Sequence, residues 1–153
     1  MFKLTLLILS FIAIFAVVES TVDAGISTRS AEAKGTLLCG RSPAVGVKVY
    51  LKREQSEGIE DIIGHAVTDD DGKFVVNGNT ERYGGAKSTI DPVLIFYHKC
   101  DKPEAKSFQV FNFRFPRTYV TIGRVSRRPY DIGTYNLQIQ YPKQYEDKIA
   151  PDY

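Results

Sequence analysis

Tryptophan is absent from this 153-residue chain, and its single methionine is the first residue. The hydrophobic core must therefore be built from Val, Ile, Leu, Phe and Tyr, a composition that favours β-strands. No asparagine is followed two residues later by Ser or Thr, so N-glycosylation is not expected. The net charge is only +2, which is too small to indicate a nucleic-acid-binding protein.

Catalytic signatures are missing as well. The chain has no Gly-x-Ser-x-Gly elbow, no His-Glu-x-x-His pair and no glycine-rich phosphate loop. We interpret its two histidines, His65 and His98, as a residue at the solvent edge and a packed strand residue. The sequence therefore predicts no enzymatic activity, no cofactor and no metal ion.

The N-terminus carries the one long hydrophobic run of the chain. Residues 4–18 follow a lysine and are interrupted by only two polar residues, the pattern of a secretory signal peptide. Small residues permit cleavage after Ser20 or after Ala24. An uncleaved anchor is the alternative, but the run is shorter than the ~20 residues that usually span a bilayer. We predict that residues 1–20 are a signal peptide and that the mature protein is secreted, with no transmembrane segment.

The two cysteines, Cys39 and Cys100, each lie at the end of a strand-like run. A secreted chain meets an oxidising compartment, so one disulfide is predicted. A zinc site with His65 and His98 is the alternative, disfavoured because the two cysteines are far apart in sequence. A bond that closes a loop of 61 residues (100 − 39) is expected to stabilise the fold by roughly 4 kcal/mol.

Apolar and polar residues alternate along the mature chain, which predicts strands with one buried face. In residues 44–51 the odd-numbered positions are expected to face the core, and Lys48 and Lys52 to face solvent. Seven or eight such strands predict an all-β fold of two packed sheets. The predicted strands are residues 35–39, 44–51, 59–67, 73–76, 93–98, 107–115, 119–122 and 134–141.

Two of these runs allow more detailed predictions. Residues 93–97 have no polar interruption, which predicts a central strand that is covered on both faces. Phe108 and Val110 occupy even-numbered positions, whereas the three phenylalanines that follow occupy odd-numbered positions. The inward face is therefore expected to switch at a bulge near Val110.

Three aspartates and a glycine at residues 69–72 predict a hairpin turn, because Asp accepts bonds from nearby backbone N–H groups and Gly permits positive φ. A calcium loop is the alternative, but Val67 and Gly72 interrupt the alternate spacing of ligands. Residues 77–89 are polar and glycine-rich and predict a loop. Residues 142–153 show no clear period and are expected to fray.

A basic cluster lies late in the chain. If the loop after Phe115 and the loop at residues 123–129 share one end of the sandwich, the cluster would suit an anionic lipid headgroup or an acidic protein surface. An ordinary solvated loop is the alternative. The candidate patch, which has Tyr119 and Tyr130 nearby, consists of Arg114, Arg117, Arg124, Arg127 and Arg128.

Seven short motifs occur in a characteristic order. They are Gly35-x-Leu37-x-Cys39, Val47-x-Val49-x-Leu51, Thr68-Asp69-x-x-Gly72-x-Phe74, Gly78-x-x-Glu81, Pro92 with Ile95-x-Tyr97-His98-x-Cys100, Pro116-x-x-Tyr119-Val120-x-x-Gly123, and Tyr130-Asp131-Ile132-Gly133-x-x-Asn136-Leu137. Each motif alone is weak, but the ordered set resembles the nematode transthyretin-like family. The resemblance spans about residues 33–141.

The resemblance implies a secreted, prealbumin-type β-sandwich of seven to eight strands in which the paired cysteines match the disulfide of the family. It also implies a binding role, since one family member bridges phosphatidylserine on dying cells to an engulfment receptor. The family is similar in fold to hydroxyisourate hydrolase. That enzyme carries a C-terminal Tyr-Arg-Gly-Ser motif, which this sequence lacks, so hydrolase activity is not expected.

The expected organisation is a signal peptide at residues 1–20, an N-terminal linker at 21–32, a transthyretin-like domain at 33–141 and a C-terminal tail at 142–153. The expected function is that of a secreted, non-enzymatic binding module for an extracellular protein receptor or an anionic phospholipid surface. A carrier of a small hydrophobic ligand and a structural extracellular protein are the alternatives.

Overall fold

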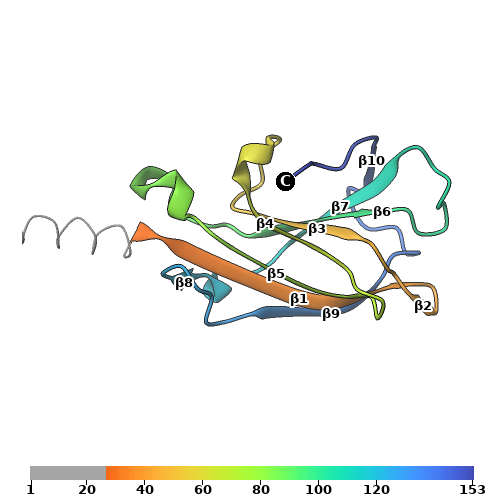
Figure 1. The fold of residues 1–153 in the computed structure, drawn as a ribbon, viewed down its shortest axis with the longest axis horizontal. Helices are drawn as coiled ribbons and strands as arrows, with labels where there is room; N and C mark the ends of the chain where they lie inside the picture. Colours follow the sequence, from red (N-terminus) through yellow and green to blue (C-terminus); the bar gives the residue numbers. More distant parts are fainter. Residues whose placement is uncertain (1–26) are drawn as a thin grey trace, which may run out of the picture.

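Two β-sheets pack face to face in the computed structural model, which describes residues 27–153 (Figure 1). The predicted signal peptide lies outside the described residues. The first sheet contains β1 (Arg29–Cys39), β2 (Ser42–Pro43), β5 (Lys73–Asn79), β8 (Thr121–Ile122) and β9 (Tyr130–Asn136). The second contains β3 (Lys48–Lys52), β4 (Ile62–Val67), β6 (Val93–His98), β7 (Phe108–Arg114) and β10 (Tyr145–Asp147).

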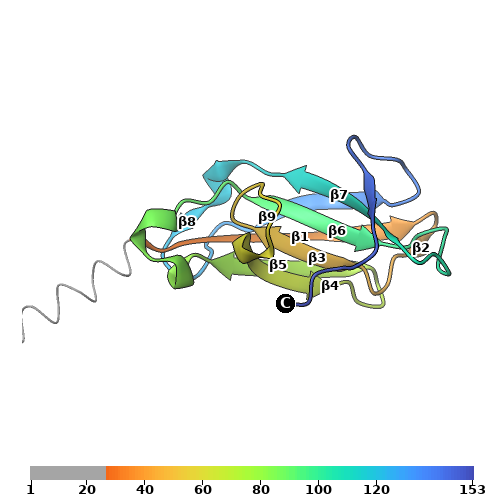
Figure 2. The same cartoon turned by 90° about the horizontal axis from the view of Figure 1, so that it is seen from above.

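Strand β1 is the centre of the first sheet. It pairs antiparallel with β2, β5 and β8, and parallel with β9. The second sheet is antiparallel throughout and has the order β10-β7-β6-β3-β4, and Figure 2 shows β7, β6, β3 and β4 side by side from above. Three of the ten strands have only two or three residues. The predicted two-sheet β-sandwich is confirmed, with seven longer strands among residues 27–153 and one disulfide.

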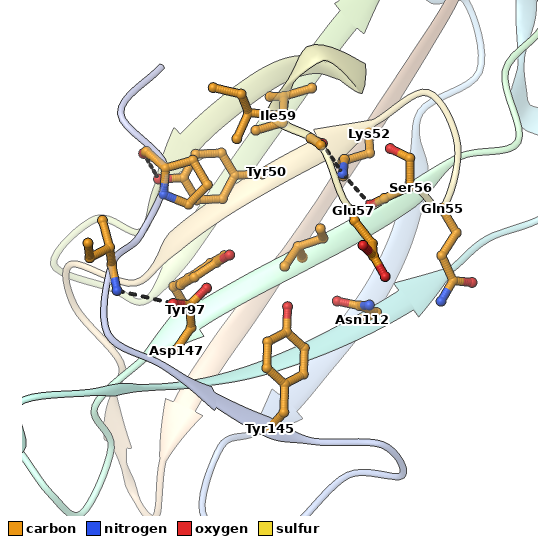
Figure 3. Close-up of a pocket in the computed structure, with 15 residues that line it drawn as sticks. Tyr50, Lys52, Gln55, Ser56, Glu57, Ile59, Tyr97, Asn112, Tyr145 and Asp147 are labelled. Atoms are coloured by element: carbon orange, nitrogen blue, oxygen red, sulfur yellow. Dashed lines mark hydrogen bonds between the residues drawn. The ribbon is translucent and has the colours of Figure 1, made fainter.

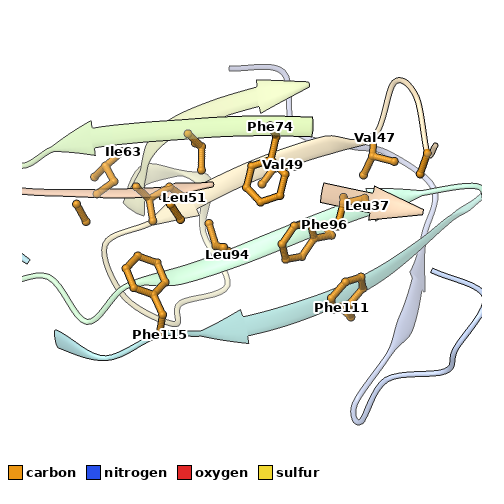
Figure 4. Packing of buried hydrophobic residues seen from close by; sticks show 14 of the residues in the cluster. Leu37, Val47, Val49, Leu51, Ile63, Phe74, Leu94, Phe96, Phe111 and Phe115 are labelled. Atoms are coloured by element: carbon orange, nitrogen blue, oxygen red, sulfur yellow. The ribbon is translucent and has the colours of Figure 1, made fainter. Parts of the chain in front are cut away.

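Side chains from both sheets fill the space between them (Figure 4). Phe96 of β6 is fully buried, stacks on Phe111 at a centroid distance of 4.7 Å and meets Phe74 of the opposite sheet edge-on at 5.7 Å. Val49 and Leu51 point into the same core and are fully buried, as the alternation in β3 predicts. The central position of β6, between β3 and β7, confirms the prediction from its uninterrupted apolar run.

Part of the outer face of the second sheet is also buried, which the sequence analysis predicted for residues 93–97 but not for the neighbouring strands. A second hydrophobic cluster there brings Tyr50, Tyr97 and Val110 against Ala150 of the C-terminal segment. The predicted bulge near Val110 is wrong: β6 and β7 pair in regular register, with Tyr97 opposite Val110. Apolar residues occupy both even- and odd-numbered positions of β7 because each face of the strand packs in a hydrophobic cluster.

Lys52 also departs from its prediction. We expected it to face solvent, but its side chain is buried, with only 3% exposure. The loop after β3 folds over the outer face, and the Nζ of Lys52 donates to the carbonyl oxygens of Ser56 and Gly58 at 2.7 and 2.5 Å. The alternation of residues in β3 assigns Lys52 to the outer face correctly but carries no information about what covers that face.

The aspartate turn between β4 and β5 is not a hairpin, because the two strands belong to different sheets. Its local chemistry is as predicted: Asp69 Oδ1 accepts from the backbone N–H groups of Asp71 and Lys73 at 3.0 and 2.8 Å, and Gly72 has a φ of 73°. The turn therefore carries the chain from one sheet to the other. Strands β4 and β5, which flank the turn, contact each other across the two sheets.

The ordered strands extend beyond the domain boundaries expected from the sequence. β1 begins at Arg29, within the predicted linker, because its first residues pair with β5 and β8. Residues 145–147 were expected to fray but form β10 against β7. The last strand of the first sheet covers residues 130–136 rather than 134–141. No helix within residues 27–153 has the length and hydrophobicity needed to cross a membrane.

Cys39 and Cys100 form the predicted disulfide, with a Cα–Cα distance of 5.6 Å. Cys39 is the last residue of β1, and Cys100 follows β6 by two residues. The bond therefore joins the two sheets covalently.

His98 provides a pH-dependent prediction. It is buried beside the disulfide, and its Nδ1 accepts from the backbone N–H of Cys100 at 3.3 Å. Burial lowers the pKa of His98 below its ordinary 6.5, and Asp101 only partly offsets this effect. In the unfolded chain His98 takes up a proton near pH 6.5, whereas in the folded chain it does so only at lower pH. Neutral His98 therefore contributes to the free energy of unfolding above pH 6.5, and this contribution is lost as the pH falls below 6.5.

We expect a His98→Asn variant, which retains an acceptor near the Cys100 amide, to lose less unfolding free energy than wild type between pH 7 and pH 5. Urea denaturation at several pH values measures this difference. Equal losses in the two proteins would show that His98 does not contribute to acid sensitivity.

Candidate functional site

The loops that carry the predicted arginines meet at one end of the sandwich. Strand β8 pairs with the beginning of β1, next to the 3-10 turn η4 (Arg117–Tyr119) (Figure 1). Residues 122–128, here called the arginine loop, fold back onto η4, because the guanidinium of Arg128 donates to the carbonyl oxygen of Thr118 at 3.2 Å. The side-chain amide of Asn79 donates to the carbonyl oxygen of Arg124 at 3.1 Å and fixes the other side of the loop.

Acidic partners engage three of the five arginines. Arg114 and Arg117 share Asp91, at N–O distances of 3.4 and 4.0 Å. Arg124 pairs with Glu81 of η2 (Glu81–Tyr83) at 2.6 Å. These pairs are largely exposed to solvent, so each contributes at most about 1 kcal/mol to stability. Their main effect is to orient the arginines and to reduce the net charge of the patch.

Arg127 and Arg128 are exposed and have no acidic partner among residues 27–153. The two arginines of the predicted patch that lack an acidic partner therefore both belong to the arginine loop.

Aromatic rings connect this end to the core. The Cζ of Arg128 lies 5.8 Å from the ring centroid of Tyr119, which meets Tyr130 edge-on at 4.7 Å. Tyr130 in turn stacks on the buried Phe115 at 5.0 Å. Contacts of this kind stabilise a guanidinium over a ring by about 0.5–1 kcal/mol at exposed sites. The base of the arginine loop is therefore packed against the sandwich.

Two aliphatic side chains of the arginine loop face solvent. Val125 is 74% exposed and Ile122 is 61% exposed. The sequence analysis identified the arginines but missed these residues. The available signal was Val125 itself, an aliphatic residue between Arg124 and Arg127 that has no place in an alternating strand pattern. Amphipathic helices that lie in the membrane interface also combine basic and exposed apolar side chains.

A second feature missed by the sequence analysis is a cavity of about 820 Å³ on the outer face of the second sheet (Figure 3). Strands β3, β6 and β7 form its floor, the loop after β3 forms one wall, and the C-terminal segment forms the other. Its lining includes Tyr50, Lys52, Tyr97, Asn112 and Tyr145. The signal for this site was the set of apolar residues on the outward-facing positions of β6 and β7. In β6 they were interpreted as a covered central strand, and in β7 they were attributed to a bulge.

The remaining candidate residues lie apart from both features. His65 is exposed on β4 and meets the ring of Tyr153 at 5.4 Å, whereas His98 is buried beside the disulfide. The zinc alternative required two thiolates, and both sulfurs are used in the Cys39–Cys100 bond. The disulfide therefore has a structural role.

Comparison with known proteins identifies related chains. The profile of the transthyretin-like family matches residues 34–116. Transthyretin-like protein 46 of Caenorhabditis elegans is 32% identical over 145 residues, which cover 92% of this chain and 76% of that protein. Transthyretin-like protein 33 of the same organism is 32% identical over 80% of this chain and 83% of its own length. Transthyretin-like protein 5 is 29% identical over 95% and 97%.

Similarity to solved structures is weaker. A 9R-lipoxygenase from Cyanothece aligns with a TM-score of 0.42 and 22% identity over 71% of this chain and 16% of that one. An (S)-allantoin synthase aligns with a TM-score of 0.38 and 14% identity over 86% and 48%. Scores at this level carry no functional argument.

Proposed function

The chain belongs to the transthyretin-like family, and from this premise we propose that it is a secreted, non-enzymatic binding module whose arginine loop recognises anionic phospholipid surfaces. The observation that carries the proposal is the composition of this loop. It presents two unpaired arginines together with two aliphatic side chains that are more than half exposed. Arginine supplies attraction to headgroup phosphates, and the aliphatic groups supply contact with the upper acyl region.

The disulfide supports the extracellular location in this proposal. Such bonds form and persist in oxidising compartments, and the hydrophobic run at residues 4–18 has the pattern of a signal peptide. An acidic receptor surface is the alternative partner. It would use the same arginines, but it would have no general need for exposed aliphatic side chains. The contribution of Val125 therefore separates the two partners.

Vesicle sedimentation tests the proposal. Each basic residue near an anionic surface contributes about 1 kcal/mol, so an Arg127→Ala/Arg128→Ala double variant is expected to lose about 2 kcal/mol, roughly a 30-fold reduction in partitioning. A Val125→Asn variant is also expected to bind less. The vesicles are phosphatidylcholine with and without phosphatidylserine, at low and physiological salt.

A matched control comes from the other end of the sandwich. Lys102 and Lys106 are exposed in the loop between β6 and β7, so a Lys102→Ala/Lys106→Ala variant removes the same charge from a distant site. We expect it to bind nearly as well as wild type. Equal losses in both double variants would indicate unspecific charge attraction, and absence of any preference for phosphatidylserine vesicles would refute the proposal.

A further inference from the structure

The cavity on the outer face of the second sheet is bounded by well-anchored elements. Its apolar floor consists of Tyr50, Ile95 and Tyr97, with the two tyrosine rings edge-on at 5.5 Å. One wall is the loop after β3, which is fixed by a buried ion pair: the guanidinium of Arg53 lies 2.8 Å from Asp61 Oδ1. Because both members of the pair are about 95% buried, this wall is preformed.

The C-terminal segment forms the opposite wall and is held at three points. The hydroxyl of Tyr50 donates to the carbonyl oxygen of Pro151 at 2.6 Å. Ala150 is buried in the cluster on the outer face, and the guanidinium of Arg82 lies 5.4 Å from the ring centroid of Tyr153. A volume of about 820 Å³ lies within the range of small-molecule sites in proteins.

Lys52 supplies the one positive charge among the residues that line the cavity. Its side chain is 97% buried (100 − 3), and its two hydrogen-bond partners are backbone carbonyls. An ammonium group has three donors, so one remains available. Burial lowers the pKa of Lys52, and the negative charges of Asp61, Glu60 and Glu54 offset this only in part. A buried cation with neutral partners is costly, and a ligand anion would compensate it.

We propose that this cavity binds a small organic acid whose acid group meets Lys52 and whose flat apolar body lies over Tyr50, Ile95 and Tyr97. The far end of the ligand would meet polar groups, since Asn112 and the hydroxyl of Tyr145 face the cavity (Figure 3). The arginine loop takes no part in this site, so the inference goes beyond the proposed function.

Two carboxylates on the lining restrict the ligand further. Glu57 is exposed at the rim, and Asp147 lies on β10, where its Oδ1 accepts from the backbone N–H of Ile149 at 3.2 Å. Both would repel a second negative charge on the ligand. The site therefore favours monoanions over dianions, and it favours hydroxyl or amine groups at the end of the ligand distant from Lys52.

Two fluorescent probes with the same ring system test the proposal. 8-Anilino-1-naphthalenesulfonate carries one negative charge, and N-phenyl-1-naphthylamine carries none. We expect the oxidised mature protein to bind the sulfonate at one site. In a Lys52→Met variant the affinity for the sulfonate should fall at least about tenfold, because a charge-assisted hydrogen bond is lost, while affinity for the neutral probe is retained.

Lys48→Met is the matched control, since Lys48 lies on the same face of β3 but outside the cavity. It should bind both probes as wild type does. An Asn112→Phe variant fills the cavity from an exposed position of β7 and should weaken the binding of both probes. It keeps the proposal testable if Lys52→Met does not fold. Unchanged sulfonate binding in Lys52→Met or in Asn112→Phe would overturn it.

The two proposals fail separately. Lys52→Met and Asn112→Phe should keep wild-type binding to phosphatidylserine vesicles, and the Arg127→Ala/Arg128→Ala variant should keep wild-type binding of the sulfonate. Loss of sulfonate binding in the arginine variant would assign the probe to the arginine loop and overturn the cavity site.

Discussion

Replacing both cysteines by serine is expected to lower the free energy of unfolding by about 4 kcal/mol. The Cys39–Cys100 bond closes a loop of 61 residues, and in the chain-entropy model its main effect is to restrict the unfolded chain. The bond also links β1 of one sheet to the end of β6 in the other, so its loss lets the sheets separate without covalent restraint. A loss of this size is a large part of the 5–15 kcal/mol that stabilises a typical domain.

Urea denaturation followed by far-UV circular dichroism measures this loss. Wild-type protein with and without a reducing agent provides the control, because the reduced protein should match the Cys39→Ser/Cys100→Ser variant. A difference below about 1 kcal/mol between the oxidised protein and both of these forms would show that noncovalent packing alone holds the sheets together.

Alanine in place of Gly64 or Gly78 is expected to destabilise the sandwich by about 3 kcal/mol or more. These glycines lie where β4 of the second sheet and β5 of the first sheet approach each other most closely in their backbones. A Cβ atom on Gly64 would lie 1.9 Å from the carbonyl oxygen of Asn77, and one on Gly78 would lie 2.2 Å from the carbonyl oxygen of Ile63. Because both obstacles are backbone atoms, the strands themselves must move apart.

Gly85 provides the matched control for this prediction. A Cβ atom there has no neighbour within 4 Å, and its φ is not positive. Gly85→Ala should therefore leave thermal stability nearly unchanged. A melting temperature for Gly64→Ala or Gly78→Ala as high as that of Gly85→Ala would show that the two strands do not approach as closely as described.

The sequence predicted those features that depend on local pattern. β6 was predicted with its observed ends, because its five consecutive apolar residues, followed by His98, are typical of a buried strand. The disulfide followed from two cysteines and a leader sequence. The turn at Asp69 was correct in its hydrogen bonds and in the positive φ of Gly72. The strand and the turn depend on interactions within a few residues. For the disulfide, each cysteine has only one possible partner in the chain.

Features that depend on distant segments were missed or misassigned. The pattern around Val110 led to the prediction of a bulge, and the alternation in β3 led to the assignment of Lys52 to solvent. Neither pattern reveals that residues 145–151 and the loop after β3 cover the outer face of the second sheet. The hairpin prediction at residues 69–72 failed for a related reason. A turn sequence fixes the local backbone but does not determine whether its flanking strands join the same sheet.

The candidate patch was predicted only in outline. Sequence proximity suggested one basic cluster, whereas Arg114, Arg117 and Arg124 pair with Asp91 and Glu81 from distant loops. This pairing leaves Arg127 and Arg128 as the unpaired charges and directs attention to the exposed Val125 beside them. Spacing along the chain does not show which arginines have acidic partners, because those partners come from separate loops.

The absence of tryptophan allows a direct test of the central proposal, that the arginine loop enters the interface of anionic membranes. A Val125→Trp variant carries a single reporter at the tip of the loop. Its emission should shift to shorter wavelength with phosphatidylserine vesicles but not with phosphatidylcholine vesicles. The control is Ile149→Trp, a similarly exposed position in the C-terminal segment. The proposal is contradicted if Val125→Trp binds these vesicles without a shift, or if the shift occurs at position 149 instead.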